Sequence, residues 1–173
     1  GVLYDPGQES DYTILFTSTI SDAADVKTVK EWNHCTLKSG WRGFSAGGCQ
    51  NSINFRENPQ FLISTGDSGA VTHYLLSREE ELDSSDEFDE IGLYLAKTDD
   101  TPKRKLVKID DIKAKSKFSD STEAYLKHKL TKKTCYVLIP CAFEEGSESD
   151  FTLDIFSDVD MKVKELGPPD HYE

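Results

Sequence analysis

Residues 40–51 read GWRGFSAGGCQN and residues 55–61 read FRENPQF, and these two stretches decide the fold of the chain. Paired glycines allow backbone angles that side chains forbid, so they predict a tight turn after the bulky Trp41. The residue before a proline is pushed towards extended geometry, which predicts the entry into a strand. The sequence therefore predicts an aromatic anchor, a glycine turn and an extended strand, in that order.

Short runs of alternating apolar residues recur along the chain, whereas helical periodicity is scarce. The clearest run is residues 151–155, in which Thr152 and Asp154 are expected to face water. Residues 135–139 are continuously apolar, as in a strand buried on both faces, and we expect Pro140 to end that strand. Further strands are expected at residues 12–19, 30–37, 60–64, 71–75, 91–95, 105–109 and 161–166.

Residues 119–130 are expected to form one short helix, starting near Ser121 or Thr122, with an extended segment as the alternative. The many short strands and turn-rich loops elsewhere predict an all-β fold, an antiparallel β-sandwich of about eight strands. Trp32 and Trp41 flank the first strand and are expected to anchor its core.

Composition and charge narrow the classes of partner. The formal net charge of −12 argues against nucleic acid, because phosphate binding needs concentrated positive charge. Residues 103–133 nevertheless carry a local balance of +7, which leaves −19 for the rest of the chain. The four cysteines form no C-x-x-C pair and no histidines have metal spacing, which argues against zinc and leaves disulfides open. No charged-then-apolar leader opens the sequence, so we expect reduced cysteines and a cytoplasmic protein.

An acidic segment at residues 79–90 holds eight carboxylates in twelve positions, which is the raw material for a calcium site. These residues are Glu79, Glu80, Glu81, Asp83, Asp86, Glu87, Asp89 and Glu90. The spacing is not that of an EF-hand, whose loop glycine is missing. A solvated acidic loop is the alternative, and it would still attract a basic surface within a Debye length of about 8 Å.

A lysine-rich stretch follows and is the candidate contact to anionic lipid. It comprises Lys103, Arg104, Lys105 and Lys108, continued by Lys113, Lys115 and Lys117. The surrounding negative charge opposes lipid binding, and lysines on an edge strand also prevent unwanted strand pairing. The alternative is that these lysines form a solvated edge of the sheet. If they do meet lipid, the protein is expected at the membrane surface as well as in the cytoplasm.

The pattern W-R-x-x-x-A-G-G-C-x-N followed by F-x-x-N-P-Q resembles the start of domain III of the calpains, the β-sandwich after the protease core. Its positions here include Trp41, Gly47, Gly48, Asn51, Asn58 and Pro59. Later matches at IGLY (91–94), YVLIP (136–140) and DFTL (150–153) extend the resemblance over most of the chain.

The resemblance implies a domain organisation. It implies a C2-like sandwich over residues 29–167 and a C-terminal tail at residues 168–173. It also implies that residues 1–28 are the end of a preceding catalytic-domain strand and a linker, so the chain is expected to be part of a longer protein.

Calpain domain III carries no catalytic residue, and the catalytic contexts of the family, G-x-C-W, G-H-A-Y and N-P-W-G, do not occur here. The resemblance implies a non-catalytic regulatory and scaffolding module of an intracellular cysteine protease, with a response to calcium or phospholipid. The implied partners are the catalytic domain of the same chain, anionic phospholipid or another protein. A pure protein-interaction module without a ligand is the alternative.

The sequence departs from the family at its charged loops. Conventional calpains carry an acidic loop just after the N-P-Q strand, where this chain has only TGDSG at residues 65–69. They are basic after the next strand, where this chain is acidic. The family's pairing of an acidic loop with lysines of the protease core is therefore not carried over to these residues.

Overall fold

The computed structural model describes residues 32–79, 89–99, 101–118 and 121–168. These residues contain nine strands, two short 3₁₀ turns and no α-helix. The strands are β1 (Asn33–Trp41), β2 (Phe61–Ser64), β3 (Ala70–Glu79), β4 (Ile91–Thr98), β5 (Ile112–Lys115), β6 (Glu123–Leu130), β7 (Cys135–Ala142), β8 (Ser149–Ser157) and β9 (Lys162–Glu165). The turns, η2 (Gly43–Ser45) and η3 (Phe55–Glu57), both lie between β1 and β2.

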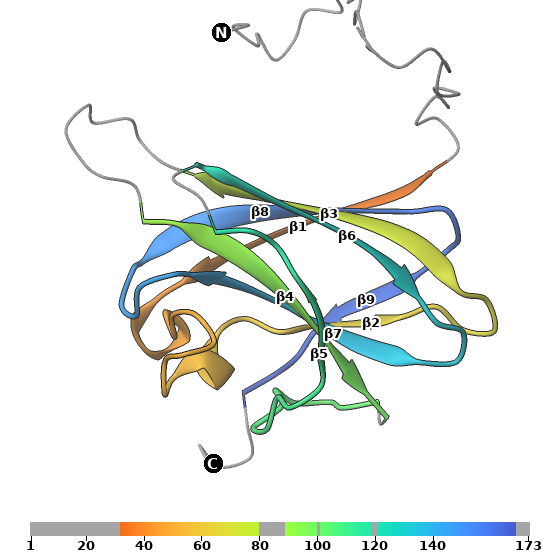
Figure 1. Cartoon of the computed structure of the whole chain (residues 1–173), viewed down its shortest axis with the longest axis horizontal. Coiled ribbons are helices and arrows are strands. Elements are labelled where there is room, and N and C mark those ends of the chain that lie inside the picture. The colour runs from red at the N-terminus through yellow and green to blue at the C-terminus, as the bar shows by residue number, and fades with distance from the viewer. Residues whose placement is uncertain (1–31, 80–88, 100, 119–120, 169–173) are drawn as a thin grey trace, which may run out of the picture.

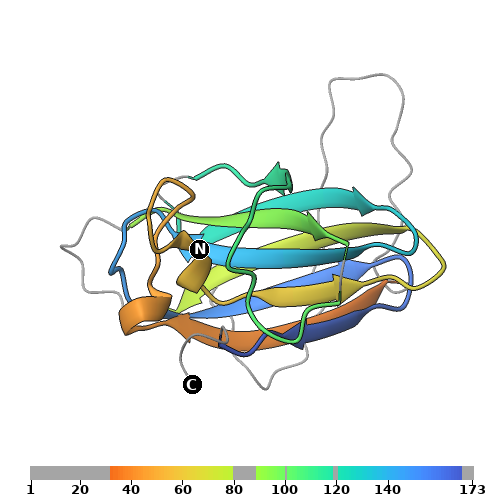
Figure 2. The ribbon, with the colours of Figure 1, turned by 90° about the horizontal axis from the view of Figure 1, so that it is seen from below.

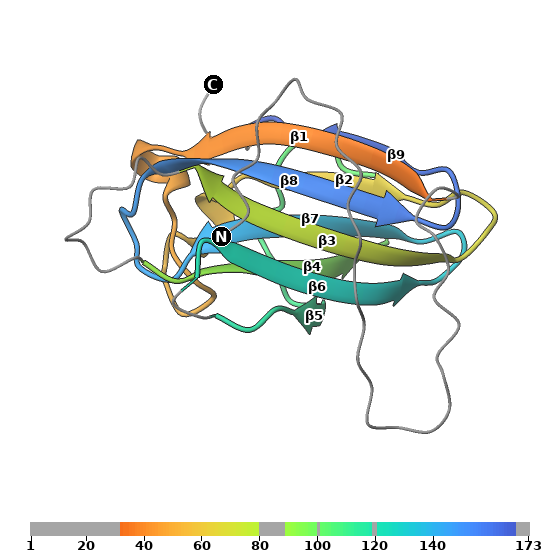
Figure 3. The same cartoon turned by 90° about the horizontal axis from the view of Figure 1, so that it is seen from above.

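The strands form two antiparallel sheets that face each other (Figure 1). The four-stranded sheet has the order β1-β8-β3-β6 and is the nearer layer in Figure 3. The five-stranded sheet has the order β5-β4-β7-β2-β9 and is the nearer layer in Figure 2. The prediction of an all-β antiparallel β-sandwich is confirmed, with nine strands in place of about eight.

The core lies between the sheets and follows the alternation seen in the sequence. In β8, Phe151, Leu153 and Ile155 are at most 1% exposed, while Thr152 and Asp154 are half-buried on the opposite face. Strands of both sheets supply such rows of apolar side chains. Burying them stabilises the fold by about 25 cal/mol for each Å² of apolar surface removed from water.

Trp41 is fully buried at the end of β1. Its ring centroid lies 4.6 Å from that of Phe151, and its Nε1 donates a hydrogen bond to the carbonyl oxygen of Pro140 at 3.1 Å. Trp32 is instead half-exposed and packs edge-on against His73, outside the core. The expectation that both tryptophans anchor the core is therefore right for Trp41 and wrong for Trp32.

The helix expected over residues 119–130 is wrong, because Glu123–Leu130 forms the edge strand β6. Its side chains alternate with a period of two: Ala124, Leu126 and Leu130 are buried and His128 on the same face is half-buried, whereas Tyr125, Lys127 and Lys129 are exposed. Pairing with β3 satisfies the backbone and buries this apolar face, which the isolated segment could not do as a helix.

The strand expected at residues 105–109 is also wrong, since the edge strand of this region is β5, a few residues later. The backbone N–H of Leu106 donates to Gln60 Oε1 at 2.8 Å, and that of Lys105 donates to the Gly167 carbonyl oxygen at 2.8 Å. This segment is thus held by the side chain of Gln60 and by the backbone that follows β9.

Pro140 does not end β7, which continues to Ala142. Its partner in β4 is Leu93, whose N–H and C=O both bond to Ser116 on the β5 side. The nitrogen of Pro140 therefore points towards β2, and β2 pairs with β7 only as far as Leu138. The missing N–H costs no ladder hydrogen bond, which explains how a proline fits inside this strand.

The remaining expected strands at residues 60–64, 71–75, 91–95 and 161–166 correspond to β2, β3, β4 and β9. The strand expected at residues 12–19, the proposed boundary near residue 28 and most of the tail at 168–173 lie outside the described residues.

Replacing Trp41 by Ala is expected to lower the free energy of unfolding by about 3 to 5 kcal/mol, because a fully buried indole leaves a cavity. Urea unfolding followed by circular dichroism measures the loss. The same replacement at half-exposed Trp32 is the control and should cost less than about 1.5 kcal/mol. A Trp41→Ala protein as stable as the wild type would contradict the buried position.

Candidate functional site

The loop between β1 and β2 is organised by the side chain of Asn58, which is fully buried. Its Nδ2 donates to the carbonyl oxygens of Gly48 at 2.9 Å and Phe55 at 2.8 Å. Its Oδ1 accepts from the N–H of Gly47 at 3.2 Å. An irregular loop has no ladder to satisfy its buried backbone groups, so this one amide satisfies three of them.

The other sequence-predicted motif residues lie around this amide. A Cβ on Gly47 would be 2.1 Å from the carbonyl oxygen of Asn54, and Gly48 has a φ of +73°, so both positions require glycine. Pro59 is buried and leads into β2, whereas Asn51 is exposed at the edge of the loop. The motif is thus a closed turn with its backbone bonds made internally.

Gln60 was not singled out from the sequence, although it stands in the same motif. Its side chain is fully buried, donates to the carbonyl oxygens of Arg56 at 2.9 Å and Leu106 at 3.1 Å, and accepts from the Leu106 N–H at 2.8 Å. Its place in the N-P-Q motif was the signal in the sequence that could have identified it. It ties the loop to the segment between β4 and β5.

A second loop, residues 143–148, closes over the first one. The carboxylate of Glu145 accepts hydrogen bonds from Ser52 Oγ and from Asn54 Nδ2. These two bonds, with Ser52 first, lower the pKa of Glu145. We call residues 42–58 and 143–148 together the motif end of the sandwich; its larger loop is orange in Figure 1.

The motif end exposes large apolar side chains. Phe44 is 82% exposed and Ile53 is 86% exposed, and Phe143 on the second loop is 42% exposed. Single exposed apolar residues are common, but three on two loops that bond to each other are available for contact with another molecule.

The acidic segment lies mostly outside the described residues. Those outside are Glu80, Glu81, Asp83, Asp86 and Glu87. Glu79 ends β3, the carbonyl oxygen of Asp89 accepts from Arg78 Nη1 at 3.1 Å, and that of Glu90 accepts from the Phe143 N–H at 2.7 Å. The two ends of the segment are therefore fixed, one of them directly to the motif end.

Within the described ranges, no group of three or more His, Cys, Asp or Glu side chains is arranged to hold a metal ion. The four cysteines, Cys35, Cys49, Cys135 and Cys141, are unpaired, and burial raises the pKa of the Cys141 thiol. In the same ranges no helix is long and apolar enough to cross a membrane.

Two of the lysines predicted to meet lipid are engaged elsewhere. Lys105 Nζ donates to the carbonyl oxygen of Glu57 at 2.6 Å, and its partial burial lowers its pKa. Lys108 Nζ lies 2.8 Å from Asp110 Oδ2, and this hydrogen bond raises the pKa of Lys108. The ammonium group of each lysine is therefore already bound to a group of the same chain.

Arg104 makes a parallel bridge with Gly167, and Lys103 is exposed beside it. Further along, Lys113 Nζ lies 2.6 Å from Asp111 Oδ1. The structure thus distributes the basic stretch over a loop and an edge strand, and does not gather Lys103, Arg104, Lys105 and Lys108 into one free cationic patch.

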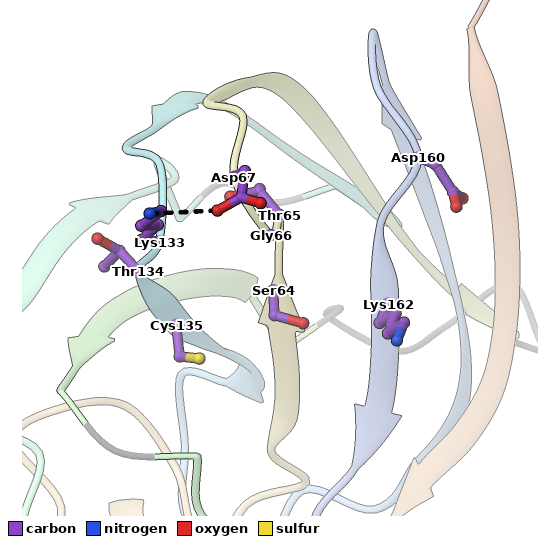
Figure 4. Close-up of a pocket in the computed structure, with 9 residues that line it drawn as sticks. All are labelled: Ser64, Thr65, Gly66, Asp67, Lys133, Thr134, Cys135, Asp160 and Lys162. Carbon is purple, nitrogen blue, oxygen red and sulfur yellow. Dashed lines mark ion pairs between the residues drawn. The ribbon is translucent and has the colours of Figure 1, made fainter.

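A polar pocket of about 520 Å³ opens at the opposite end of the sandwich (Figure 4). It lies at the turn after the N-P-Q strand, where conventional calpains are acidic. Asp67 on this turn faces Lys133, with Oδ1 and Nζ 3.4 Å apart, and Gly66 accepts from the Lys133 N–H at 2.8 Å. The acid present here is paired within the domain.

Two facing antiparallel sheets define a β-sandwich domain. The family model for the calpain large subunit, domain III, matches residues 37–156, so the chain belongs to the calpain domain III family. This domain is non-catalytic. The resemblance found in the motif is thereby confirmed.

A curated relative gives the context of the module. Serine/threonine-protein kinase 4 homolog B of Dictyostelium discoideum is 28% identical over 159 residues, which cover 89% of this chain. The matched region is 14% of that relative, so the chain spans only a small part of its length.

Replacing Asn58 by Ala is expected to lower the free energy of unfolding by about 3 kcal/mol, because three buried backbone groups lose their partner. Chemical denaturation followed by tryptophan fluorescence measures it. Asn51→Ala, an exposed amide of the same loop, should change stability by less than about 0.5 kcal/mol. Equal effects of the two replacements would show that the Asn58 amide does not organise the loop.

Proposed function

We propose that the chain is a non-catalytic regulatory and scaffolding module of a longer protein, and that its motif end docks against a neighbouring domain or partner protein. One observation carries the proposal. Phe44 and Ile53 are 82% and 86% exposed, on a loop whose backbone is fixed by the buried Asn58. A loop whose backbone is already fixed loses little backbone entropy on binding, which makes its exposed apolar side chains suitable for a specific contact.

The family supports a calpain-like context, in which the neighbour is the catalytic domain of a cytoplasmic cysteine protease. The Dictyostelium relative is named as a protein kinase. The proposed role holds in both contexts, because docking through the motif end does not depend on the chemistry of the neighbouring domain.

A calcium- or phospholipid-responsive module is the second candidate function. The acidic segment with its eight carboxylates favours it, as does the exposed Lys103. The internal bonds of Lys105, Lys108 and Lys113 weigh against it, because paired lysines attract anionic lipid less strongly. Docking to protein is therefore the better supported function.

Docking predicts that backbone amides of residues 42–58 exchange hydrogen more slowly in the full-length protein than in the 173-residue chain. Phe44→Ser together with Ile53→Ser should abolish the difference without lowering the melting temperature of the chain, since both side chains are exposed. The control pair is Val107→Ser with Tyr125→Ser, exposed apolar residues elsewhere, which should leave the difference intact. Identical exchange in the two proteins would refute docking through this surface.

Co-sedimentation of the chain with phosphatidylserine vesicles, with and without millimolar calcium and at two salt concentrations, distinguishes the second function. If docking to protein is the function, little chain sediments in any condition. Binding that requires calcium would instead indicate cation bridging by the acidic segment. Binding that salt abolishes without calcium would indicate the basic stretch, whose attraction is screened by ions.

A further inference from the structure

A pocket of about 390 Å³ opens where the motif end meets residues 115–118, and residues 49–51 and Phe143 of the motif end line it. Tyr94, Phe118 and Phe143 line it, and they belong to a series of aromatic contacts that starts in the core at Phe55. The ring centroids of Phe55 and Tyr94 are 5.0 Å apart, those of Tyr94 and Phe118 are 5.9 Å apart, and those of Phe118 and Phe143 are 5.5 Å apart. The series runs from buried Phe55 to Phe143, which is 42% exposed, so the aromatic side chains of the pocket are packed on the core.

The Tyr94 hydroxyl supplies a polar group to this pocket. Tyr94 is 4% exposed, and its hydroxyl oxygen accepts a hydrogen bond from the N–H of Gln50 at 3.4 Å. Burial raises the pKa of Tyr94, so the hydroxyl keeps its proton. In the part of the chain that the structure describes, no group accepts that proton. A donor is thus available to an acceptor that enters the pocket.

The pocket is flanked by two cations. Lys115 and Lys117 line it and are both exposed. Unlike Lys108 and Lys113, they make no ion pair with a carboxylate among the described residues. Two lysines of the basic stretch that lack a carboxylate partner among the described residues therefore lie at the mouth of an aromatic pocket.

We propose that this pocket binds an acidic peptide segment of a partner protein, with an aromatic side chain against the aromatic residues of the pocket and flanking carboxylates at Lys115 and Lys117. The buried hydroxyl of Tyr94 would donate to a carbonyl or carboxylate oxygen of the peptide. This inference rests on the proposed docking function and names the chemistry of the partner. A lipid surface fits less well, since membrane-binding clusters commonly use about four to eight basic residues and only two lie here.

The test uses the 173-residue chain and a fluorescent pentapeptide, acetyl-Glu-Glu-Phe-Glu-Glu-amide, in a fluorescence polarisation titration. Replacing Lys115 and Lys117 together by Glu should weaken binding about tenfold, because two attractions become repulsions. The control replaces Lys127 and Lys129 by Glu, the same change of charge on β6 of the other sheet, and should alter affinity by less than about twofold. A peptide with Ser in place of Phe should bind more weakly than the parent peptide.

A second readout locates the peptide. Cys49 lines the pocket and Cys35 lies on β1 of the other sheet, so bound peptide should slow alkylation of Cys49 and leave that of Cys35 unchanged. Equal weakening by both lysine pairs would overturn the proposal, as would unchanged alkylation of Cys49 or its protection by phosphatidylserine vesicles in place of the peptide. If residues 42–58 are protected in the full-length protein but the peptide does not bind, only the pocket assignment fails. If neither is observed, the docking function fails as well.

Discussion

The buried amide of Asn58 is the interaction on which the rest of the motif end depends. Loops are normally kept at the surface because their backbone groups need water or a ladder. Here one side chain takes that place for three backbone groups, so the path from β1 to β2 can cover the end of the core and stay dry inside. Phe44 and Ile53 on the same loop are exposed to solvent, on a backbone that these bonds hold in place.

The ion pairs within this domain say more about its charged surface than its net charge does. The net charge of −12 suggests a molecule that repels anions, yet the structure neutralises many charges in place. Lys108 and Lys113 meet nearby aspartates, and Asp67 meets Lys133 across a turn. A partner meets the charges that are not paired within the domain. In the described residues these include the two lysines beside the aromatic pocket.

The sheet architecture was predictable from the sequence, because burial between two sheets imposes a period of two, as at Phe151, Leu153 and Ile155. The motif was predictable because glycine and proline restrict the backbone locally. Pro140 and Lys105 were not, since their environments depend on where other strands end. The meeting of Tyr94, Lys117 and Phe143 in one pocket could not be predicted from the sequence either, because it depends on strand register and on how the loops close.

The buried Gln60 has a mechanical consequence. Its backbone carbonyl oxygen accepts a hydrogen bond from the N–H of Leu166, and its side chain bonds to the backbone of Leu106. The N–H of the neighbouring Lys105 donates to the carbonyl oxygen of Gly167. Tension applied at the carboxyl end of the domain would load these bonds together with the pairing of β9 and β2, and would so reach the residue beside Asn58. The connection runs in both directions, so a force on the motif end would also act on Leu166 and Gly167 after β9.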